Sequence, residues 1–328
     1  MGKGISFGSA VVGLTMAQAC GGQPETGDPP AINQQSLGAC ETEGGGVAPM
    51  IEAGGAPAVI PGPPAGTPPN ITGFTVRIEN KCNIPLYLHT EGGGGSLNPA
   101  DPVLMPNMVI TPTKDTWPTG WIQVFGEQGH TSMLELVQVT VVRGTIWYKF
   151  DHGDGIAIPM EVYASGAGPE CGKRTGCYVP RAQVMSGCPD GLMVGQKCVA
   201  PGIYCADPAN ATKAVCHALD APIANCAKKP ECAAAASLTS KQAYDCDKFF
   251  GTSYKWCAAI NRGILDTPDS TDVTQFYKGT GVNGYAAWLH SFCHAYAFPY
   301  DDYNNPADDT MHTCRNATGV SVTFCPSG

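Results

Sequence analysis

Apolar and polar residues alternate with a period of two along Phe74–Glu79, which predicts a strand with one buried face. Further runs have strand-like composition and are separated by turn-forming Gly, Pro and Asn residues: Leu86–His89, Met108–Thr111, Trp121–Phe125, Met133–Val142, Thr145–Asp151, Ile156–Tyr163 and Val320–Phe324. Many short strands with frequent turns favour an antiparallel β-sandwich or barrel. We therefore expect a mainly β core.

The pattern changes between Cys171 and Cys293. There the density of cysteines rises and the alternation stops, while Lys241–Phe250 and Tyr285–His294 have the composition of short helices. The sequence therefore predicts a folded domain over residues 71–328. Its β core carries a disulfide-rich, partly helical subdomain at about residues 171–292.

The N-terminal segment, residues 1–19, has the features of an export signal. Lys3 precedes a short apolar core, Ile5–Met16, and Ala17-Gln18-Ala19 fits a cleavage site with small residues at its first and third positions. Cys20 follows at once, so a lipid anchor at this cysteine and plain secretion both stay open.

Residues 20–70 are rich in Gly and Pro and contain no Lys, Arg or aromatic residue. Such a segment buries too little apolar surface to offset the entropy that ordering would cost. We predict a disordered linker that holds the folded domain away from a surface.

Composition and charge exclude several classes of protein. Lys and Arg number 19 against 28 Asp and Glu, a formal net charge of −9, so the chain lacks the positive field that nucleic-acid binding needs. The 16 cysteines imply disulfides and an oxidising compartment, which predicts an extracellular or cell-surface protein. No run of 18 apolar residues predicts a transmembrane helix. We expect a monomer without a cofactor.

Five segments, taken in order, resemble the thaumatin-like protein family. They are its first strand at Phe74–Cys82, its Asp-Gly segment at Gly153–Met160, the start of its disulfide-rich region at Cys171–Pro189, its Cys-to-Asp-Asp run at Cys293–Asp302 and its ending at Val320–Pro326. The resemblance spans about residues 72–328 and implies a thaumatin-like antiparallel β-sandwich with a disulfide-rich subdomain.

The resemblance also implies disulfide pairs, namely Cys82–Cys325, Cys171–Cys314, Cys177–Cys293 and Cys188–Cys198. Six further cysteines lie in the folded domain, and because six allow 15 pairings their partners stay open: Cys205, Cys216, Cys226, Cys232, Cys246 and Cys257.

Members of that family have an acidic groove lined by one Arg, one Glu and three Asp. By motif position Glu135 matches the Glu, Asp154 matches one Asp, and Asp301 or Asp302 matches another. Two positions depart from the pattern. Lys149 stands where the third Asp would lie, and the segment 120–125 contains no Arg.

Separated carboxylates are what glycoside hydrolysis requires, because one must donate a proton while the other activates water or attacks the sugar. The resemblance makes Glu135 the candidate proton donor and Asp154 the base or electrostatic partner. A cationic Lys149 would hold both carboxylates ionised, which counts against hydrolysis. Trp121 and Tyr300 are candidates for stacking on sugar rings, although aromatics at strand spacing more often pack in a core.

Two other patterns have ordinary structural interpretations. His290 and His294 have the i, i+4 spacing of metal ligands on a helix, but no Glu follows the first, so structural histidines are favoured and no metal site is predicted. The acidic residues that begin at Asp301 lack the fixed spacing of a calcium loop and are read as a solvated loop.

These observations predict a secreted or surface-tethered protein that binds β-1,3-glucan-type polysaccharide in an acidic groove, where weak endo-β-1,3-glucanase activity (a glycoside hydrolase) is also open. Structural roles for Glu135, Asp154 and Asp301 remain an alternative. So does a non-enzymatic function, as a defence or antifungal-like effector or an inhibitor of foreign hydrolases.

Overall fold

The computed structural model describes residues 75–98, 100–114, 116–129, 133–142, 144–169, 171–189, 191–246, 254–304 and 311–326. Contacts divide the chain into Met1–Leu37 and Gly38–Gly328, and every described residue belongs to the second unit. The predicted export signal and linker lie outside the described residues. Within the described part of the chain, no helix has both the length and the apolar character needed to cross a bilayer.

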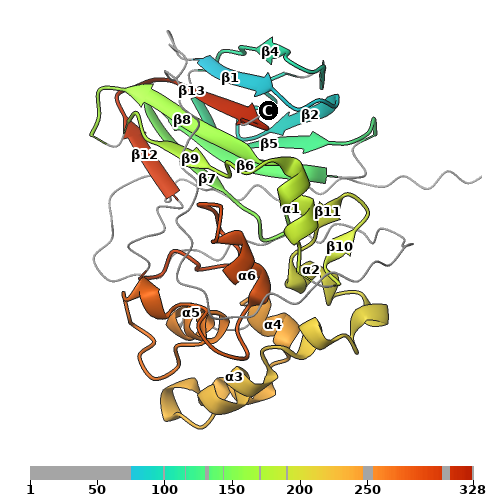
Figure 1. The fold of residues 1–328 in the computed structure, drawn as a ribbon. Coiled ribbons are helices and arrows are strands. Elements are labelled where there is room, and N and C mark those ends of the chain that lie inside the picture. The colour runs from blue at the N-terminus through green and yellow to red at the C-terminus, as the bar shows by residue number, and fades with distance from the viewer. Residues whose placement is uncertain are drawn as a thin grey trace, which may run out of the picture. The chain divides into compact units, whose positions relative to one another are not determined.

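Two β-sheets form the first part of the fold (Figure 1). The five-stranded sheet has the order β4 (Val109–Ile110), β1 (Thr75–Asn80), β13 (Ala317–Phe324), β8 (Met160–Gly166), β9 (Arg174–Gly176). The six-stranded sheet has the order β12 (Met311–Arg315), β7 (Thr145–Phe150), β6 (Met133–Val142), β5 (Thr116–Phe125), β2 (Leu86–Glu91), β3 (Val103–Leu104). A hairpin joins β10 (Met193–Val194) to β11 (Lys197–Cys198).

The core between the sheets follows from the alternation of the sequence. On β6, Val137, Val139 and Val141 are fully buried, while the residues between them are partly exposed. Val320 and Val322 of β13 are also fully buried. Because side chains on a strand point to opposite faces in turn, one face of each sheet builds the core. The prediction of a mainly β fold is confirmed.

One strand pair corrects the expectation of an antiparallel sandwich. Strands β1 and β13 are parallel, with Val76 opposite Val320, whereas the other strand pairs in the two sheets are antiparallel. A disulfide between Cys82 and Cys325 follows the C-terminal ends of these two strands. The first and last strands therefore lie side by side in the centre of the five-stranded sheet.

The second part of the fold consists mainly of helices, which are grouped next to the sheets (Figure 1). Its α-helices are α1 (Arg181–Gly187), α2 (Pro201–Tyr204), α3 (Asp220–Cys226), α4 (Ser240–Tyr244), α5 (Tyr254–Arg262) and α6 (Gly284–Leu289). Its 3₁₀ helices are Pro208–Asn210, Ala214–His217, Pro230–Ser237 and Val273–Gln275. Side-chain caps begin two of the α-helices, Thr239 at α4 and Asn283 at α6. All these helices lie within the cysteine-rich region that the sequence marks as partly helical.

Disulfides hold this helical part together and tie it to the sheets. The structure contains the four pairs that the sequence resemblance implied, Cys82–Cys325, Cys171–Cys314, Cys177–Cys293 and Cys188–Cys198. The six remaining cysteines pair with neighbours in sequence, as Cys205–Cys216, Cys226–Cys232 and Cys246–Cys257.

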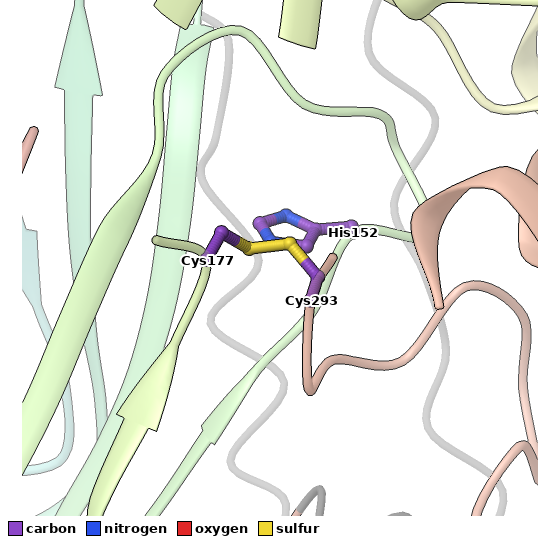
Figure 2. A group of neighbouring side chains, drawn as sticks. All are labelled: His152, Cys177 and Cys293. Carbon is purple, nitrogen blue, oxygen red and sulfur yellow. A yellow bond between two sulfur atoms is a disulfide. The ribbon is translucent and has the colours of Figure 1, made fainter. Parts of the chain in front are cut away.

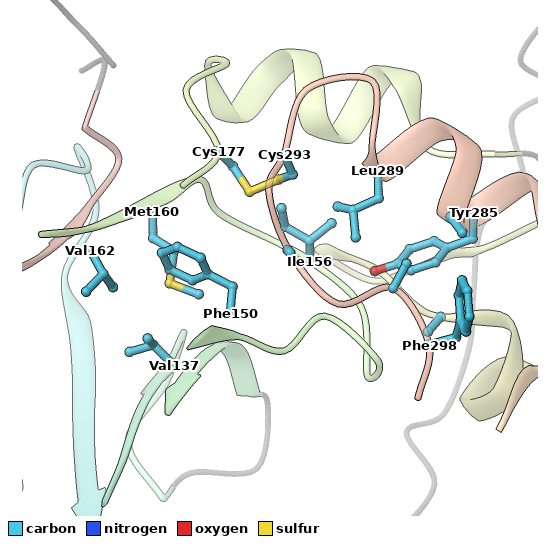
Figure 3. Close-up of a cluster of buried hydrophobic side chains, with 14 of the residues drawn as sticks. Val137, Phe150, Ile156, Met160, Val162, Cys177, Tyr285, Leu289, Cys293 and Phe298 are labelled. Carbon is cyan, nitrogen blue, oxygen red and sulfur yellow. A yellow bond between two sulfur atoms is a disulfide. The ribbon is translucent and has the colours of Figure 1, made fainter. Parts of the chain in front are cut away.

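The sheets and helices share a buried core (Figure 3). Val137, Phe150 and Met160 reach it from the sheets, and Tyr285 and Leu289 reach it from α6. The Cys177–Cys293 disulfide lies among these side chains. The junction between the two parts is therefore apolar and is crosslinked by a disulfide. Close packing of these side chains restricts the movement of the loop that follows β7.

Candidate functional site

The loop between β7 and β8, residues 151–159, carries the candidate chemistry. Asp151 forms a parallel bridge with Tyr296, and Ile156 forms an antiparallel bridge with Cys198. Within the loop, the Gly153 amide donates to Asp151 Oδ1 over 3.1 Å and the Gly155 amide donates to the His152 carbonyl over 2.9 Å. The loop is thus held by hydrogen bonds at both ends and in its middle.

Gly155 is required for this loop conformation. Its φ is +110°, a value that side chains with a Cβ rarely adopt, and an added Cβ would overlap the carbonyl oxygen of Cys198. The close approach of the loop to β11 therefore depends on glycine, and it places the neighbouring Asp154 beside this hairpin.

Asp154 is half-buried, and burial raises the pKa of its carboxyl group above the usual value of 3.8. Lys197 of β11 opposes this shift, because its positive charge lowers the pKa. Nearby carboxylates add to the rise: Asp151, Asp245 and Glu135. Asp154 is thus a carboxyl group that holds its proton to a higher pH than an ordinary aspartate, which is the property a proton donor needs.

Glu135 lies in the interior. Its side chain has no exposed surface, because β6 directs it to the same face as its buried valines. His152 Nδ1 lies 2.7 Å from Glu135 Oε1, and the amides of Ala157 and Leu136 donate to the carboxylate, each over 3.4 Å. These contacts fix the position of the Glu135 carboxylate, which has no contact with solvent.

Lys149 acts on Asp151 and not on Asp154. Its ammonium group lies 3.5 Å from Asp151 Oδ2 and 4.7 Å from the centre of the Tyr296 ring. The sequence predicted that Lys149 would keep the catalytic carboxylates ionised. In the structure, Lys197 is the cation that lowers the pKa of Asp154, and burial still outweighs it. The expectation that a lysine at position 149 holds Asp154 ionised is therefore corrected.

The outward face of the six-stranded sheet carries a row of polar and aromatic side chains. Glu91 lies opposite Trp121, Trp121 opposite Gln138, and Gln138 opposite Lys149 across four neighbouring strands. All but Glu91 are half-buried, whereas the residues that alternate with them belong to the core. Asp151 continues the alternation of β7 two residues after Lys149. The row therefore leads from an indole ring towards the acidic loop.

Asp301 has a structural environment. Its side chain has no exposed surface and accepts hydrogen bonds from the Ala297 amide and from His290 Nε2, each over 2.8 Å. The guanidinium nitrogen Nη2 of Arg262 lies 3.8 Å from Asp301 Oδ1. The expectation that Asp301 lines a groove does not agree with this burial, because a bound sugar would have no access to the carboxylate.

The neighbours of Asp301 are more accessible than Asp301 itself. Tyr300 stacks on Tyr254 with 5.0 Å between the ring centres, and Asp302 is exposed. His290 contacts the Asp301 carboxylate through Nε2 over 2.8 Å.

Among the residues that the structure describes, one group has the composition and spacing of metal ligands. It consists of His152, Cys177 and Cys293, all buried, and the two sulfur atoms form a disulfide (Figure 2).

Sequence reasoning missed several of the titratable residues that surround Asp154. Asp151 and His152 stand within three residues of Asp154, so their proximity was available as a signal. Asp245 and Lys197 come from the cysteine-rich part, and only the folding of that part brings their charges close to the loop. No spacing in the sequence could have indicated them.

A model of a known protein family matches part of the chain. A family model described as Beta-1,3-glucanase matches residues 223–323, which run from α3 to β13 and include Asp245 but not Glu135, Asp151 or Asp154. A search of curated proteins gives no significant match.

Solved structures share the fold at low sequence identity. A beta-1,3-glucanase domain (GH64) from Clostridium beijerinckii aligns with a TM-score of 0.58 and 12% identity, over 78% of this chain and all of that one. A laminaripentaose-producing beta-1,3-glucanase from Paenibacillus barengoltzii, solved with laminarihexaose, aligns with a TM-score of 0.52 and 15% identity, over 80% and 76% of the two chains. A further laminaripentaose-producing beta-1,3-glucanase, solved with laminaritetraose, aligns with a TM-score of 0.54 and 12% identity, over 77% and 98%.

These findings correct the resemblance drawn from the sequence. The family whose model matches is a beta-1,3-glucanase family, and the structures that align over most of the chain are beta-1,3-glucanases of GH64. The thaumatin-like assignment is therefore wrong. Its motifs were short segments around cysteines, prolines and strand ends, which disulfide-rich β proteins of different families can share.

Proposed function

We propose that this protein hydrolyses β-1,3-glucan internally, as an endo-β-1,3-glucanase, and that Asp154 is its proton donor. One observation carries the proposal: a half-exposed carboxyl group whose pKa is raised by burial and by neighbouring carboxylates. The glucanase family model over residues 223–323 and the fold shared with beta-1,3-glucanases support the choice of substrate.

In this proposal Asp154 gives its proton to the glycosidic oxygen as the bond to the leaving sugar breaks. Asp151, half-exposed and three residues away, takes a proton from the water that attacks the sugar carbon. The two carboxyl groups thus exchange their protonation states in one turnover. Solvent then restores the starting state.

Glu135 has a different role from the one expected from the sequence. Because its side chain is buried against His152, it is a positioning residue in this proposal and acts through its negative charge. That charge raises the pKa of Asp154 and so favours the protonated donor.

The outward row on the six-stranded sheet supplies the binding surface in this proposal. Trp121 offers a flat apolar ring, while Gln138 and Lys149 offer hydrogen-bond donors beside it. Ligand sites for sugars combine such features. A chain of sugar rings along this row would lead to Asp151.

We also propose that the protein works outside the cytoplasm, either secreted or tethered through a lipid at Cys20. The disulfides throughout the helical part support an oxidising compartment.

The test is hydrolysis of laminarin and of insoluble β-1,3-glucan, measured as released reducing sugar. We expect Asp154→Asn and Asp151→Asn each to lower the rate by about 100-fold or more, with retention on insoluble glucan preserved. Asp266→Asn is the matched control, because the Asp266 side chain is almost fully exposed and its carboxylate lies 3.0 Å from the ammonium group of Lys229. A correctly oxidised wild-type protein that binds glucan but releases no sugar would reduce the function to binding. One that neither binds nor hydrolyses glucan would reject the proposal.

A further inference from the structure

A histidine and a disulfide lie in contact at the junction of the two parts of the fold (Figure 2). His152 Nε2 is 3.5 Å from Cys177 Sγ, and the side chains of His152, Cys177 and Cys293 place their ligand atoms within 4.8 Å of one another. All three residues have no exposed surface. The proposed glucanase mechanism uses neither sulfur atom.

The two ring nitrogens of His152 face different groups. Nε2 faces the sulfur of Cys177, while Nδ1 faces the Glu135 carboxylate at 2.7 Å. Around metal-bound histidines one ring nitrogen binds the metal while the other faces a carboxylate or carbonyl group. Here Nδ1 lies close to the Glu135 carboxylate, although the pair does not have the geometry of a hydrogen bond. A carboxylate at this distance attracts a proton on Nδ1, which favours the tautomer whose Nε2 lone pair is available to a metal.

The distances fit a small tetrahedral ion. With bond lengths of about 2.3 Å to sulfur and about 2.05 Å to nitrogen, a tetrahedral Zn²⁺ site separates its sulfur and nitrogen ligands by roughly 3.6 Å. The observed distance between Cys177 Sγ and His152 Nε2 is 3.5 Å. The two sulfurs, which are now bonded, would have to separate to roughly 3.8 Å.

We propose that reduction of the Cys177–Cys293 disulfide converts this group into a binding site for a thiophilic divalent cation of the zinc class. His152 Nε2, Cys177 Sγ and Cys293 Sγ are its ligands, the Glu135 carboxylate faces the other ring nitrogen, and one water molecule that enters with the ion is the fourth ligand. The oxidised protein has no site here, because the sulfur atoms are bonded to each other.

The chemistry balances with a dithiol as the reductant. Its two thiols pass two electrons and two protons to the disulfide, so that the dithiol becomes a disulfide and Cys177 and Cys293 become thiols. Metal binding then releases the two thiol protons to solvent, because thiolates are the ligands. The two negative charges that remain balance the charge of the cation in a buried setting.

The first experiment uses the full chain, reduced with a phosphine and titrated with Co²⁺ as a spectroscopic probe. Cysteines are then alkylated and identified by peptide mass spectrometry. We expect about one equivalent of thiolate-bound Co²⁺ and protection from alkylation at Cys177 and Cys293. Cys177→Ser/Cys293→Ser should lose the signal. Cys226→Ser/Cys232→Ser, which removes another buried disulfide, should keep it. Equal alkylation of Cys177 and Cys293 with and without Co²⁺ would overturn the proposal.

A second variant tests the site while the other disulfides stay formed. Cys293→His, refolded under oxidising conditions, cannot form the bond to Cys177 but still presents a ligand at position 293. We expect a Co²⁺–thiolate absorption band, which addition of His152→Leu abolishes and addition of Glu135→Gln weakens by about 10- to 100-fold in affinity. If Cys293→Asp gives the band and Cys293→His does not, the site still stands with a smaller ligand. A folded protein that shows no band in either variant contradicts it.

Discussion

The hydroxyl of Tyr285 donates a hydrogen bond to the main-chain carbonyl of His152 over 2.8 Å, and so joins helix α6 to the loop that carries Asp154. Burial raises the pKa of this tyrosine well above its usual range, so the hydroxyl keeps its proton and remains a donor. The same carbonyl also accepts from the Gly155 amide. The helical part therefore contributes directly to the conformation of the acidic loop.

We expect Tyr285→Phe to lower the free energy of unfolding by about 0.5–1.5 kcal/mol, because one hydrogen bond is lost while its acceptor keeps a second donor. Urea unfolding measures the change. Tyr163→Phe, on the half-exposed face of β8, is the control and should have a smaller effect. Equal losses in the two variants would show that the bond to His152 adds nothing to stability.

The raised pKa of Asp154 gives the activity a defined dependence on pH. The donor form is lost as pH rises through that pKa, so the alkaline limb of the activity profile should report Asp154. Lys197 lowers the pKa, and Lys197→Met should therefore move this limb to higher pH. Asp245→Asn removes a charge that raises the pKa and should move the limb to lower pH. Limbs that stay in place in both variants would assign the donor to another group.

The same shift affects stability. A carboxyl group whose folded pKa is raised binds more protons in the folded state than in the unfolded state. Its contribution is therefore fully present below the unfolded value of 3.8 and is lost as pH rises through the folded pKa. Asp154→Asn should accordingly gain stability over wild type as pH increases towards neutrality, measured as Tm from pH 3 to pH 8.

Asp220 is a control for this pH dependence of stability, because its pKa is lowered whereas that of Asp154 is raised. Burial raises its pKa, but hydrogen bonds from Ser240 and His217 outweigh this and lower it. Its contribution is thus present above the unfolded pKa and is lost as pH falls through the lowered folded pKa. Asp220→Asn should cost stability at neutral pH and little in strong acid. Parallel pH curves for the two variants would contradict both assignments.

The sequence allowed the larger strands to be predicted, because their alternation is long enough to read. Strand β6 has the predicted bounds, Met133–Val142. Strands β3, β10 and β11 have two residues each, and so short a segment shows no alternation. The parallel pairing of β1 with β13 joins strands from opposite ends of the domain, which no local pattern encodes.

The candidate site was predictable only in part, for a similar reason. Glu135 and Asp154 were selected by motif position in the thaumatin-like resemblance. Their environments depend on distant groups: His152 buries Glu135, and Lys197 opposes the pKa rise of Asp154. The burial of Asp301 likewise depends on contacts with the fold of the helical part, such as Arg262. Charges identified along the chain therefore did not indicate which carboxyl group could hold a proton.

The outward row on the six-stranded sheet predicts where glucan is bound. We expect Trp121→Ala to raise KM for laminarin by about 10-fold, equivalent to about 1.4 kcal/mol, with kcat little changed. Trp147→Ala is the control, because Trp147 lies on the same face in the neighbouring row, opposite Thr140 and Thr313. If both variants change KM alike, the glucan does not follow the row of Trp121.

Two reasons make glycine necessary at position 155, its positive φ and its close contact with Cys198, and a comparison with Gly144 distinguishes their effects. Gly155 and Gly144 both have positive φ, +110° and +81°, but an added Cβ at Gly144 meets nothing within 4 Å, whereas at Gly155 it overlaps the carbonyl of Cys198. Gly144→Ala should therefore cost only the strain of its backbone, about 1–2 kcal/mol of unfolding free energy. Gly155→Ala should lower the free energy of unfolding further, because the loop must also move away from β11.

Movement of the loop in Gly155→Ala exposes Asp154 to water, which lowers the pKa of Asp154 towards the usual value. We expect the alkaline limb of the activity profile to move to lower pH in Gly155→Ala and to stay in place in Gly144→Ala. Laminarin hydrolysis across pH, together with urea unfolding, measures both effects, and an unchanged limb in a destabilised Gly155→Ala protein would separate the loop contact from the tuning of Asp154.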